Sequence, residues 1–180
     1  MKLFRMASVL ILLALAGMGQ AADWRDKLKT ELPLLGHRNW IVVADAAYPA
    51  QSRPGIETLY VGGDQIEVLR EVLKAVEGTK HVRANLFGDA ELRSVPEADA
   101  PGISAYRKKL DALLQDRPVH TLPHEDVIAK LDDTAKTFRV LILKTDLTLP
   151  YTSVFLQLDC GYWSADAEKR LREAIRRKEK

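Results

Sequence analysis

Three short apolar segments limit what this chain can fold into more than any other feature of its sequence. They cover residues 40–44 (Trp-Ile-Val-Val-Ala), 138–143 (Phe-Arg-Val-Leu-Ile-Leu) and 154–158 (Val-Phe-Leu-Gln-Leu). Runs of this length are too short for a buried helix, and their lack of polar alternation is typical of strands covered on both faces of a sheet. Amphipathic stretches lie between the runs. This alternation predicts a single three-layer α/β/α domain with a largely parallel sheet.

The remaining predicted elements follow the same alternation. Further strands are expected at 58–61, 81–87 and 118–122, and helices at about 24–35, 66–76, 103–114 and 125–135. Gly36 is the residue type that best ends the first helix, while Pro33 interrupts its last turn. Asp64 and Glu67 have the spacing of a capping box in front of the second helix. Residues 94–102 contain two prolines and a glycine and predict a surface loop.

The first 21 residues predict a cleavable secretory signal peptide. Lys2 and Arg5 form a positive start, residues 7–16 form an apolar run, and small residues lead to Ala21 and Ala22, where cleavage is expected. The apolar run is shorter than the roughly 20 residues that a membrane-spanning helix requires. The sequence therefore predicts a periplasmic or secreted protein without a stable membrane anchor.

The charge balance gives no indication of a nucleic-acid partner. The chain has 27 Lys and Arg against 25 Asp and Glu, and the predicted signal peptide holds two of the basic residues, so the mature chain has 25 of each sign. Basic residues collect after Ser164, a predicted helix N-cap, with acidic residues interleaved. Residues 164–180 are therefore expected to add an amphipathic helix to a domain at 22–163, and a solvated helix face is favoured over a partner-binding patch.

Sequence motifs for several common chemistries are absent. The chain has no Gly-x-Gly-x-x-Gly, no Gly-x-x-x-x-Gly-Lys-Ser/Thr and no Gly-x-Ser-x-Gly, so dinucleotide, P-loop and serine-hydrolase chemistry lack their usual support. His120 and His124 have the spacing of helical metal ligands, but Pro123 between them disfavours a helix, and no metal site is expected. Cys160 is the only cysteine, so it cannot form an internal disulfide; an inert, buried thiol is expected there.

Polar residues stand at the ends of the predicted apolar strands. His37 precedes the strand at 40–44, and Asp45 follows it; His124 follows the strand at 118–122, and Tyr151 precedes the last strand. Sheets of α/β domains place their ligands at such strand ends. Each residue alone also has a structural explanation, as a loop, turn, helix-start or half-buried aromatic residue.

Together, these residues resemble the ribose pyranase and fucose mutarotase (RbsD/FucU) family. Residues 35–50, Leu-Gly-His-Arg-Asn-Trp-Ile-Val-Val-Ala-Asp-Ala-Ala-Tyr-Pro-Ala, are similar to the family's Gly-His, apolar strand and Asp-Ala-x-x-Pro pattern. Residues 122–125 (Leu-Pro-His-Glu) fall where the ribose-type members carry a histidine that contacts the substrate. Residues 151–153 (Tyr-Thr-Ser) resemble the family's Tyr-x-Asn before its final strand. The resemblance extends over about residues 24–160 and implies the RbsD-like fold.

The resemblance also implies a sugar site with an acid/base histidine and no cofactor. His37 carries over as the catalytic residue. The substrate-binding residues that carry over are Asp45, His124, Tyr151 and Ser153. Histidine suits the opening of a hemiacetal because an imidazole exchanges protons near neutral pH. Two positions depart from the family: Asn39 stands where many members have aspartate, and Ser153 replaces an asparagine whose amide both donates and accepts.

The distance between His37 and Asp45 bears on where such a site is formed. Five strand residues at roughly 3.3 Å each place the two about 16 Å or more apart. A site that uses both residues is therefore expected between subunits of a homo-oligomer. The resemblance to ring-forming oligomers implies the same arrangement.

Three functions remain open from the sequence. The first is a sugar mutarotase or pyranase outside the cytoplasm, acting on a small sugar by acid/base catalysis. The second is a monosaccharide-binding protein that has lost catalysis, which the departures at Asn39 and Ser153 make credible. The third is an envelope interaction protein that uses the additional C-terminal helix and has a vestigial pocket.

Overall fold

The computed structural model describes residues 19–178. Residues 1–18, which hold most of the predicted signal peptide, lie outside the described residues. The first described elements are helix α1 (Gly19–Glu31) and the 3₁₀ helix η1 (Leu32–Leu34). The expected cleavage position at Ala21/Ala22 falls within α1, and Trp24, which is buried in the core, lies just after it.

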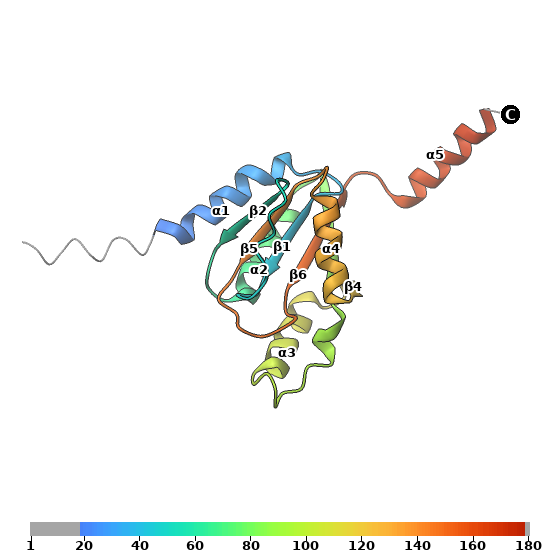
Figure 1. Cartoon of the computed structure of the whole chain (residues 1–180). Coiled ribbons are helices and arrows are strands. Elements are labelled where there is room, and N and C mark those ends of the chain that lie inside the picture. The colour runs from blue at the N-terminus through green and yellow to red at the C-terminus, as the bar shows by residue number, and fades with distance from the viewer. Residues whose placement is uncertain (1–18, 179–180) are drawn as a thin grey trace, which may run out of the picture.

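Six strands form one mixed sheet, in which one strand runs against the others. The strands are β1 (Trp40–Ala44), β2 (Ile56–Tyr60), β3 (Val82–Asp89), β4 (Val119–Leu122), β5 (Val140–Lys144) and β6 (Val154–Cys160). Their order in the sheet is β2-β5-β1-β6-β3-β4 (Figure 1). β6 pairs antiparallel with β1 and β3, and all other pairs are parallel. The largely parallel sheet predicted from the sequence is confirmed.

Helices cover both faces of the sheet, which confirms the three-layer architecture. Helices α2 (Gln65–Glu77) and α3 (Ile103–Leu114) lie with α1 on one face, and α4 (His124–Thr134) lies on the other. Ile41 and Val43 of β1 pack on the first face, and Trp40 and Val42 pack on the α4 face. Every residue of β1 is fully buried, which explains why this strand is apolar without alternation.

Helix α2 begins as its sequence predicts. The Asp64 carboxylate accepts hydrogen bonds from the backbone N–H groups of Ile66 (2.8 Å) and Glu67 (3.2 Å), which would otherwise lack partners at the helix start. The buried face that follows consists of Gln65, Ile66, Val68, Leu69, Val72, Leu73 and Val76. One face of α2 therefore contributes a continuous stripe to the core.

The structure corrects several boundaries and one burial prediction. The first helix ends at Glu31, because Pro33 is accommodated in the short 3₁₀ helix that follows. β3 continues to Asp89 and is followed by a further 3₁₀ helix, η2 (Ala90–Arg93), which the sequence did not predict. Cys160 is half-buried rather than buried, since it pairs with Val82 at the frayed ends of β6 and β3.

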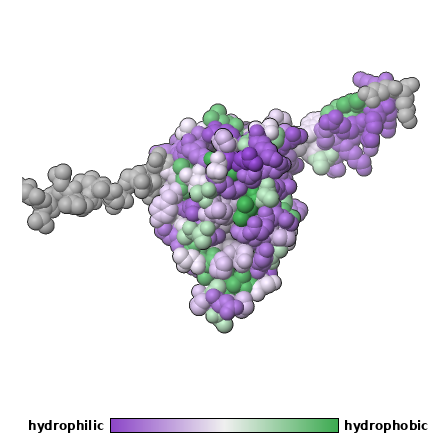
Figure 2. Space-filling model, viewed as in Figure 1, coloured by the Kyte–Doolittle hydropathy of each residue, from purple (hydrophilic) through white to green (hydrophobic). Residues whose placement is uncertain are grey.

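Helix α5 (Ala165–Lys178) extends away from the body of the domain (Figure 1). Ser164 caps it, as predicted, by accepting a hydrogen bond from the Ala167 N–H at 3.1 Å. None of its residues is buried, and Figure 2 shows a mostly hydrophilic surface with a small hydrophobic strip. Among residues 19–178, no helix combines the length and apolar character of a membrane span.

Candidate functional site

Polar side chains converge at one edge of the sheet. Asp45 follows β1, Asp89 ends β3, and His124 comes two residues after β4. Because β6 runs antiparallel to its neighbours, its first residues lie at this same edge, and Tyr151 and Ser153 precede or adjoin them. These five residues are called the edge cluster below. The edge holds the carboxyl ends of the parallel strands, where α/β sheets bind ligands.

Asp45 and Ser153 are bound directly to each other. The Ser153 hydroxyl donates to Asp45 Oδ2 at 2.9 Å, and the Asp45 N–H donates to Ser153 Oγ at 3.3 Å. The Ala47 N–H donates to the other carboxylate oxygen, Oδ1, at 2.9 Å. Both Asp45 and Ser153 are buried. This hydroxyl therefore orients the Asp45 carboxylate by a contact within the protein.

His124 is fixed by contacts on several sides. Its backbone N–H donates to the Glu91 carboxylate at 3.0 and 3.1 Å, which caps the start of α4. Its ring nitrogen Nδ1 lies 3.1 Å from Asp89 Oδ1. The rings of Tyr48 and Tyr151 meet the imidazole edge-on, with centroids 6.4 and 5.4 Å away. The imidazole therefore has a defined plane at the sheet edge.

Asp89 is a member of the site that the sequence analysis missed. Its side chain is fully enclosed, and its Oδ2 atom has no hydrogen-bond partner among residues 19–178. Burial raises the pKa of Asp89 to about 6, which the contact with His124 opposes and the nearby Glu91 and Asp45 carboxylates reinforce. Asp89 is the last residue of β3, and Asp45 directly follows β1. The strand predicted from the sequence ended at residue 87, so Asp89 was not recognised as a strand-end residue.

Tyr48 is a second missed residue. It is buried, its hydroxyl donates to Gln51 Oε1 at 3.1 Å, and its ring packs on Phe155 as well as His124. Burial, together with the charges of Asp89 and Asp45, raises the pKa of its phenol. Tyr48 therefore stays neutral and forms one wall of the edge cluster.

A buried polar network holds the segment that carries Tyr151. Tyr151 has a backbone φ of 58°, an uncommon conformation for an aromatic residue. The carbonyl of the next residue, Thr152, accepts from Gln65 Nε2 at 2.6 Å and from the Tyr106 hydroxyl at 2.8 Å. The Thr145 hydroxyl donates to Gln65 Oε1 at 3.0 Å. These bonds anchor the strained turn to α2, α3 and the end of β5.

His37 does not join the edge cluster within one subunit. It is exposed and stands before β1, at the opposite end of the strand from Asp45. Asn39, where many family members have aspartate, accepts from the Gly36 N–H at 2.8 Å and donates to the Arg139 carbonyl at 3.2 Å. Asn39 therefore closes the turn that carries His37. The other predicted site residues, Asp45, His124, Tyr151 and Ser153, are brought together.

Two cavities flank β3. One of about 430 Å³ lies at the site edge and is lined by Asp89 and Ser153 together with residues of η2, α3 and β4. A larger one, of about 610 Å³, lies toward the other end of β3. Its arginines, Arg83 and Arg117, are paired with Asp159 and Glu77 respectively. The smaller cavity is the better candidate because only it reaches the edge cluster.

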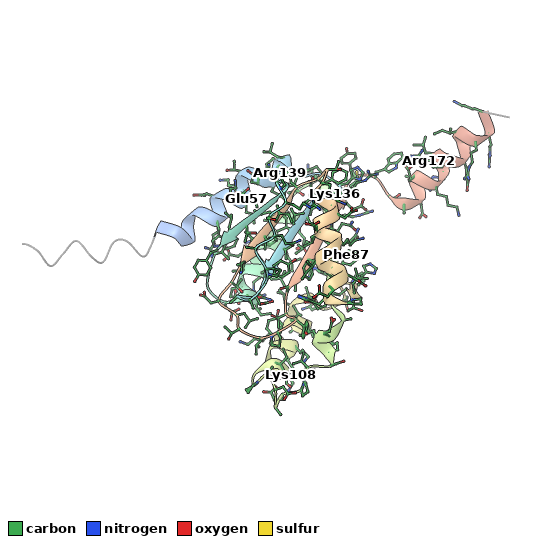
Figure 3. The ribbon with its side chains drawn as sticks, in the orientation of Figure 1. Glu57, Phe87, Lys108, Lys136, Arg139 and Arg172 are labelled. Carbon is green, nitrogen blue, oxygen red and sulfur yellow. The ribbon has the colours of Figure 1, made fainter. Side chains whose placement is uncertain are left out.

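The α4 face of β3 and β4 continues the site with aromatic rings. Phe87, labelled in Figure 3 beside α4, packs on Trp40 with ring centroids 5.2 Å apart and on His120 at 5.1 Å. The Trp40 indole N–H is buried without a hydrogen-bond partner among residues 19–178. Apolar ring faces beside convergent polar groups are typical of small-molecule sites.

A solved structure similar to this chain supports the fold. Bacillus subtilis RbsD complexed with D-ribose has 19% sequence identity and a TM-score of 0.52, with coverage of 74% of this chain and 91% of that chain. The fucose mutarotase from Streptococcus pneumoniae, in complex with L-fucose, has 25% identity and a TM-score of 0.49 at the same coverage. No curated protein sequence matches the chain.

A comparison with protein families matches residues 24–160 to one family, described as the RbsD / FucU transport protein family. The matched residues contain all six strands and the whole edge cluster. The resemblance noted in the sequence is therefore confirmed over most of the described chain. The chain belongs to the RbsD / FucU transport protein family.

Proposed function

We propose that this protein interconverts the anomers or ring forms of a monosaccharide by acid/base catalysis. The observation that carries the proposal is the edge cluster itself. An imidazole in contact with a buried carboxylate (His124 and Asp89) stands beside a second, oriented carboxylate (Asp45) on the family's fold. Such groups can exchange protons with hydroxyls and hold them by hydrogen bonds.

The chemistry requires only proton transfers. A base removes the proton of the anomeric hydroxyl, and the freed electron pair forms the carbonyl as the bond from C1 to the ring oxygen breaks. An acid protonates the departing ring oxygen. Rotation and reclosure in the opposite sense give the other anomer or ring size. No bond is oxidised or reduced, so the protein's own side chains suffice.

His37 is proposed to reach the site from a neighbouring subunit. Its exposure at the far end of β1 leaves it free to contact a second copy of the chain. An imidazole from the neighbour would supply the second acid/base group opposite His124. The site is then shared between subunits of a homo-oligomer.

The proposed substrate class is an aldose of five or six carbons. Bacillus subtilis RbsD, to which this chain is similar, is complexed with D-ribose, and the family that matches residues 24–160 also includes the FucU proteins. Ser153 is shorter than the amide usual in the family and is bound to Asp45. A substrate with fewer or differently placed hydroxyls at that position is expected to fit best.

The protein is proposed to act in the periplasm or after secretion. Residues 1–21 have the charge and apolar pattern of a signal peptide. The described core residues of α1, Trp24 and Leu28, lie after the expected cleavage position, so cleavage there would keep both in the mature chain. Mass spectrometry of the protein recovered from a periplasmic extract tests this cleavage.

Saturation-transfer NMR tests the proposed reaction. Mature protein, residues 22–180, is added to ribose, fucose or galactose, and the exchange between anomers is measured. Exchange faster than in buffer, and reduced to the buffer rate in His37→Ala, supports the enzyme. Binding without acceleration supports the alternative of a non-catalytic sugar-binding protein, which the substitutions at Asn39 and Ser153 favour. Lys108→Ala is the control, because Lys108 is exposed on α3 away from the edge cluster (Figure 3).

A further inference from the structure

Among residues 19–178, Asp89 and His124 form the one hydrogen bond between a carboxylate and an imidazole. Asp89 Oδ1 lies 3.1 Å from His124 Nδ1. The Asp89 side chain is fully enclosed, whereas the His124 side chain is 23% exposed. The other ring nitrogen, Nε2, has no hydrogen-bond partner in the described part of the chain. Nδ1 is therefore engaged by Asp89, whereas Nε2 is available to a ligand.

The charge of Asp89 determines which ring nitrogen carries the proton. An ionised carboxylate can only accept hydrogen bonds, so Nδ1 must carry a proton and donate it. In the neutral imidazole, Nε2 then has a free electron pair and can accept a proton. Without the carboxylate, nothing in the described contacts would select this tautomer.

We propose that Asp89 is a positioning residue that keeps the ring proton of His124 on Nδ1 and presents Nε2 to the ligand as a proton acceptor. This inference rests on the proposed sugar isomerase function and names the group that acts within one subunit. Nε2 would take the proton of the anomeric hydroxyl while the carbonyl forms at C1. The Asp89 carboxylate would stabilise the resulting imidazolium, which returns the proton when the ring recloses.

The surroundings of the ring support a fixed role. Tyr48 and Tyr151 contact the imidazole from two sides, and Glu91 holds its backbone N–H. These contacts leave the ring few alternative orientations, so Nδ1 stays directed at Asp89. A histidine that merely filled space at a helix start would need none of them.

Asp89 also provides a carboxylate in the site, which Asn39 does not. The carboxylate that many relatives carry near the first histidine is absent here, and Asn39 instead closes a turn. Asp89 supplies a buried carboxylate beside the other histidine of the site. The charged groups that face it are His124 from α4, Glu91 from η2 and Asp45 from the end of β1.

Burial of Asp89 sets the pH range in which the pair can work. Its pKa of about 6 means that the carboxylate form, which selects the Nδ1 tautomer, becomes dominant only above about pH 6. Catalysis is therefore expected to fall on the acid side of this value. Asn at this position cannot titrate, so the Asp89→Asn variant should lose the part of the pH dependence that comes from Asp89 and keep only the part that comes from protonation of the base itself.

The 15N chemical shifts of the His124 ring test the tautomer directly, at pH 8 and without any sugar. The His124 signals are assigned as those missing in His124→Gln. In the wild-type protein the proton is expected on Nδ1; in Asp89→Ala it should redistribute toward Nε2. The Asp89→Asn amide can either accept from Nδ1–H or donate to Nδ1, so this variant should give a tautomer ratio between those of the wild type and Asp89→Ala.

Kinetic measurements separate the effect of the Asp89 charge from its effect on the orientation of the His124 ring. Asp89→Asn is expected to lower kcat for anomer exchange by about 10- to 100-fold with little change in KM, because the imidazolium loses its stabilising charge. Its rate should fall less steeply than the wild-type rate on the acid side of pH 6, because only protonation of the base Nε2 then remains. Asp133→Asn, which breaks the exposed ion pair with Lys136 at the opposite end of α4 from His124, is the matched control and should match the wild type.

The ring nitrogen shifts and the kinetics distinguish a wrong role for Asp89 from a wrong proposed function. A wild-type ring protonated on Nε2, or an Asp89→Ala ring unchanged from wild type, overturns the role of Asp89 whatever the activity. So does an active protein whose Asp89→Asn variant keeps the wild-type kcat and pH profile. A wild-type protein that does not accelerate anomer exchange disproves the proposed function instead, and the ring nitrogen shifts then decide the inference alone.

Discussion

Ser153 donates its hydroxyl hydrogen bond to Asp45 Oδ2 at 2.9 Å, across the pair of antiparallel strands at the centre of the sheet. The two residues are 108 positions apart in sequence and both are buried. The bond therefore links the end of β1 to the start of β6. Together with the Ala47 N–H, which donates to Oδ1, it leaves both oxygens of the Asp45 carboxylate bound by the protein.

Loss of this bond is expected to destabilise the fold. Ser153→Ala leaves a buried carboxylate oxygen without its donor, and the free energy of unfolding should fall by about 1–3 kcal/mol. Urea denaturation followed by circular dichroism measures the change. Ser52→Ala, in the exposed loop before β2, serves as the control. An unchanged midpoint for Ser153→Ala would show that water replaces the hydroxyl at no cost.

The raised pKa of Asp89 predicts a pH dependence of stability. The carboxyl ordinarily titrates at 3.8 but at about 6 in the folded protein, so the folded state binds more protons between these values. Its contribution to the unfolding free energy is complete below about pH 4 and is lost as pH rises through about 6, amounting to about 2–3 kcal/mol. Asp89→Asn removes this dependence. Between pH 5 and pH 7.5 the wild type should therefore lose unfolding free energy relative to Asp89→Asn.

Denaturation at both pH values, with Asp133→Asn as the control, measures that shift. A constant difference between Asp89→Asn and wild type across this range would contradict the raised pKa. The comparison uses differences between proteins at each pH, so titration of other groups common to both cancels.

The network behind Tyr151 predicts a graded response to substitution. Tyr106→Phe removes one donor to the Thr152 carbonyl, which keeps the bond from Gln65, so a loss of about 1 kcal/mol is expected. Gln65→Leu removes the other donor to the Thr152 carbonyl and one of the two acceptors of the Thr145 hydroxyl, which keeps the Ala44 carbonyl, and should cost about 2–3 kcal/mol. Thermal unfolding of both variants checks the order. Equal losses would mean that the Tyr106 hydroxyl, rather than the Gln65 amide, holds the turn.

Local sequence patterns predicted the framework of the fold but only part of the site. β1 could be identified because burial on both faces requires an apolar run, and Asp64 because a helix start requires an acceptor. Asp45 and His124 were found at the strand ends that such a sheet exposes. Their convergence depends on the sheet order, in which β6 inserts between β1 and β3, and no local pattern encodes that order.

Asp89 and Tyr48 show why the rest was missed. The significance of Asp89 comes from enclosure by residues distant in sequence, above all His124, 35 positions away. Tyr48 lies in the loop after β1, directly before Pro49, where the sequence suggests a turn residue. Folding nevertheless buries it against Phe155. Burial of a loop residue follows from tertiary packing and leaves no periodic signal.

Helix α5 is expected to be dispensable for the fold. It has no buried residue, and its exposed Leu171 and Ile175 make no contact with the described core clusters. A chain ending at Trp163 should keep the wild-type free energy of unfolding within about 0.5 kcal/mol. Denaturation curves of the two proteins test this. A marked loss of stability would show that α5 packs on the domain in solution, in this subunit or in another.

Mixing two inactive variants tests whether the site is shared between subunits. If His37 of one subunit acts with Asp45 of its neighbour, His37→Ala and Asp45→Asn homo-oligomers should each be inactive. Unfolding the two together and refolding them at equal amounts should restore activity, because about a quarter of randomly formed interfaces pair two intact residues. Anomer exchange by NMR measures the recovery, and refolding of each variant alone is the control. If each variant is inactive alone and the mixture recovers no activity, the idea of a site shared between subunits is wrong. His37 and Asp45 would then have to act within one subunit, although they lie at opposite ends of β1.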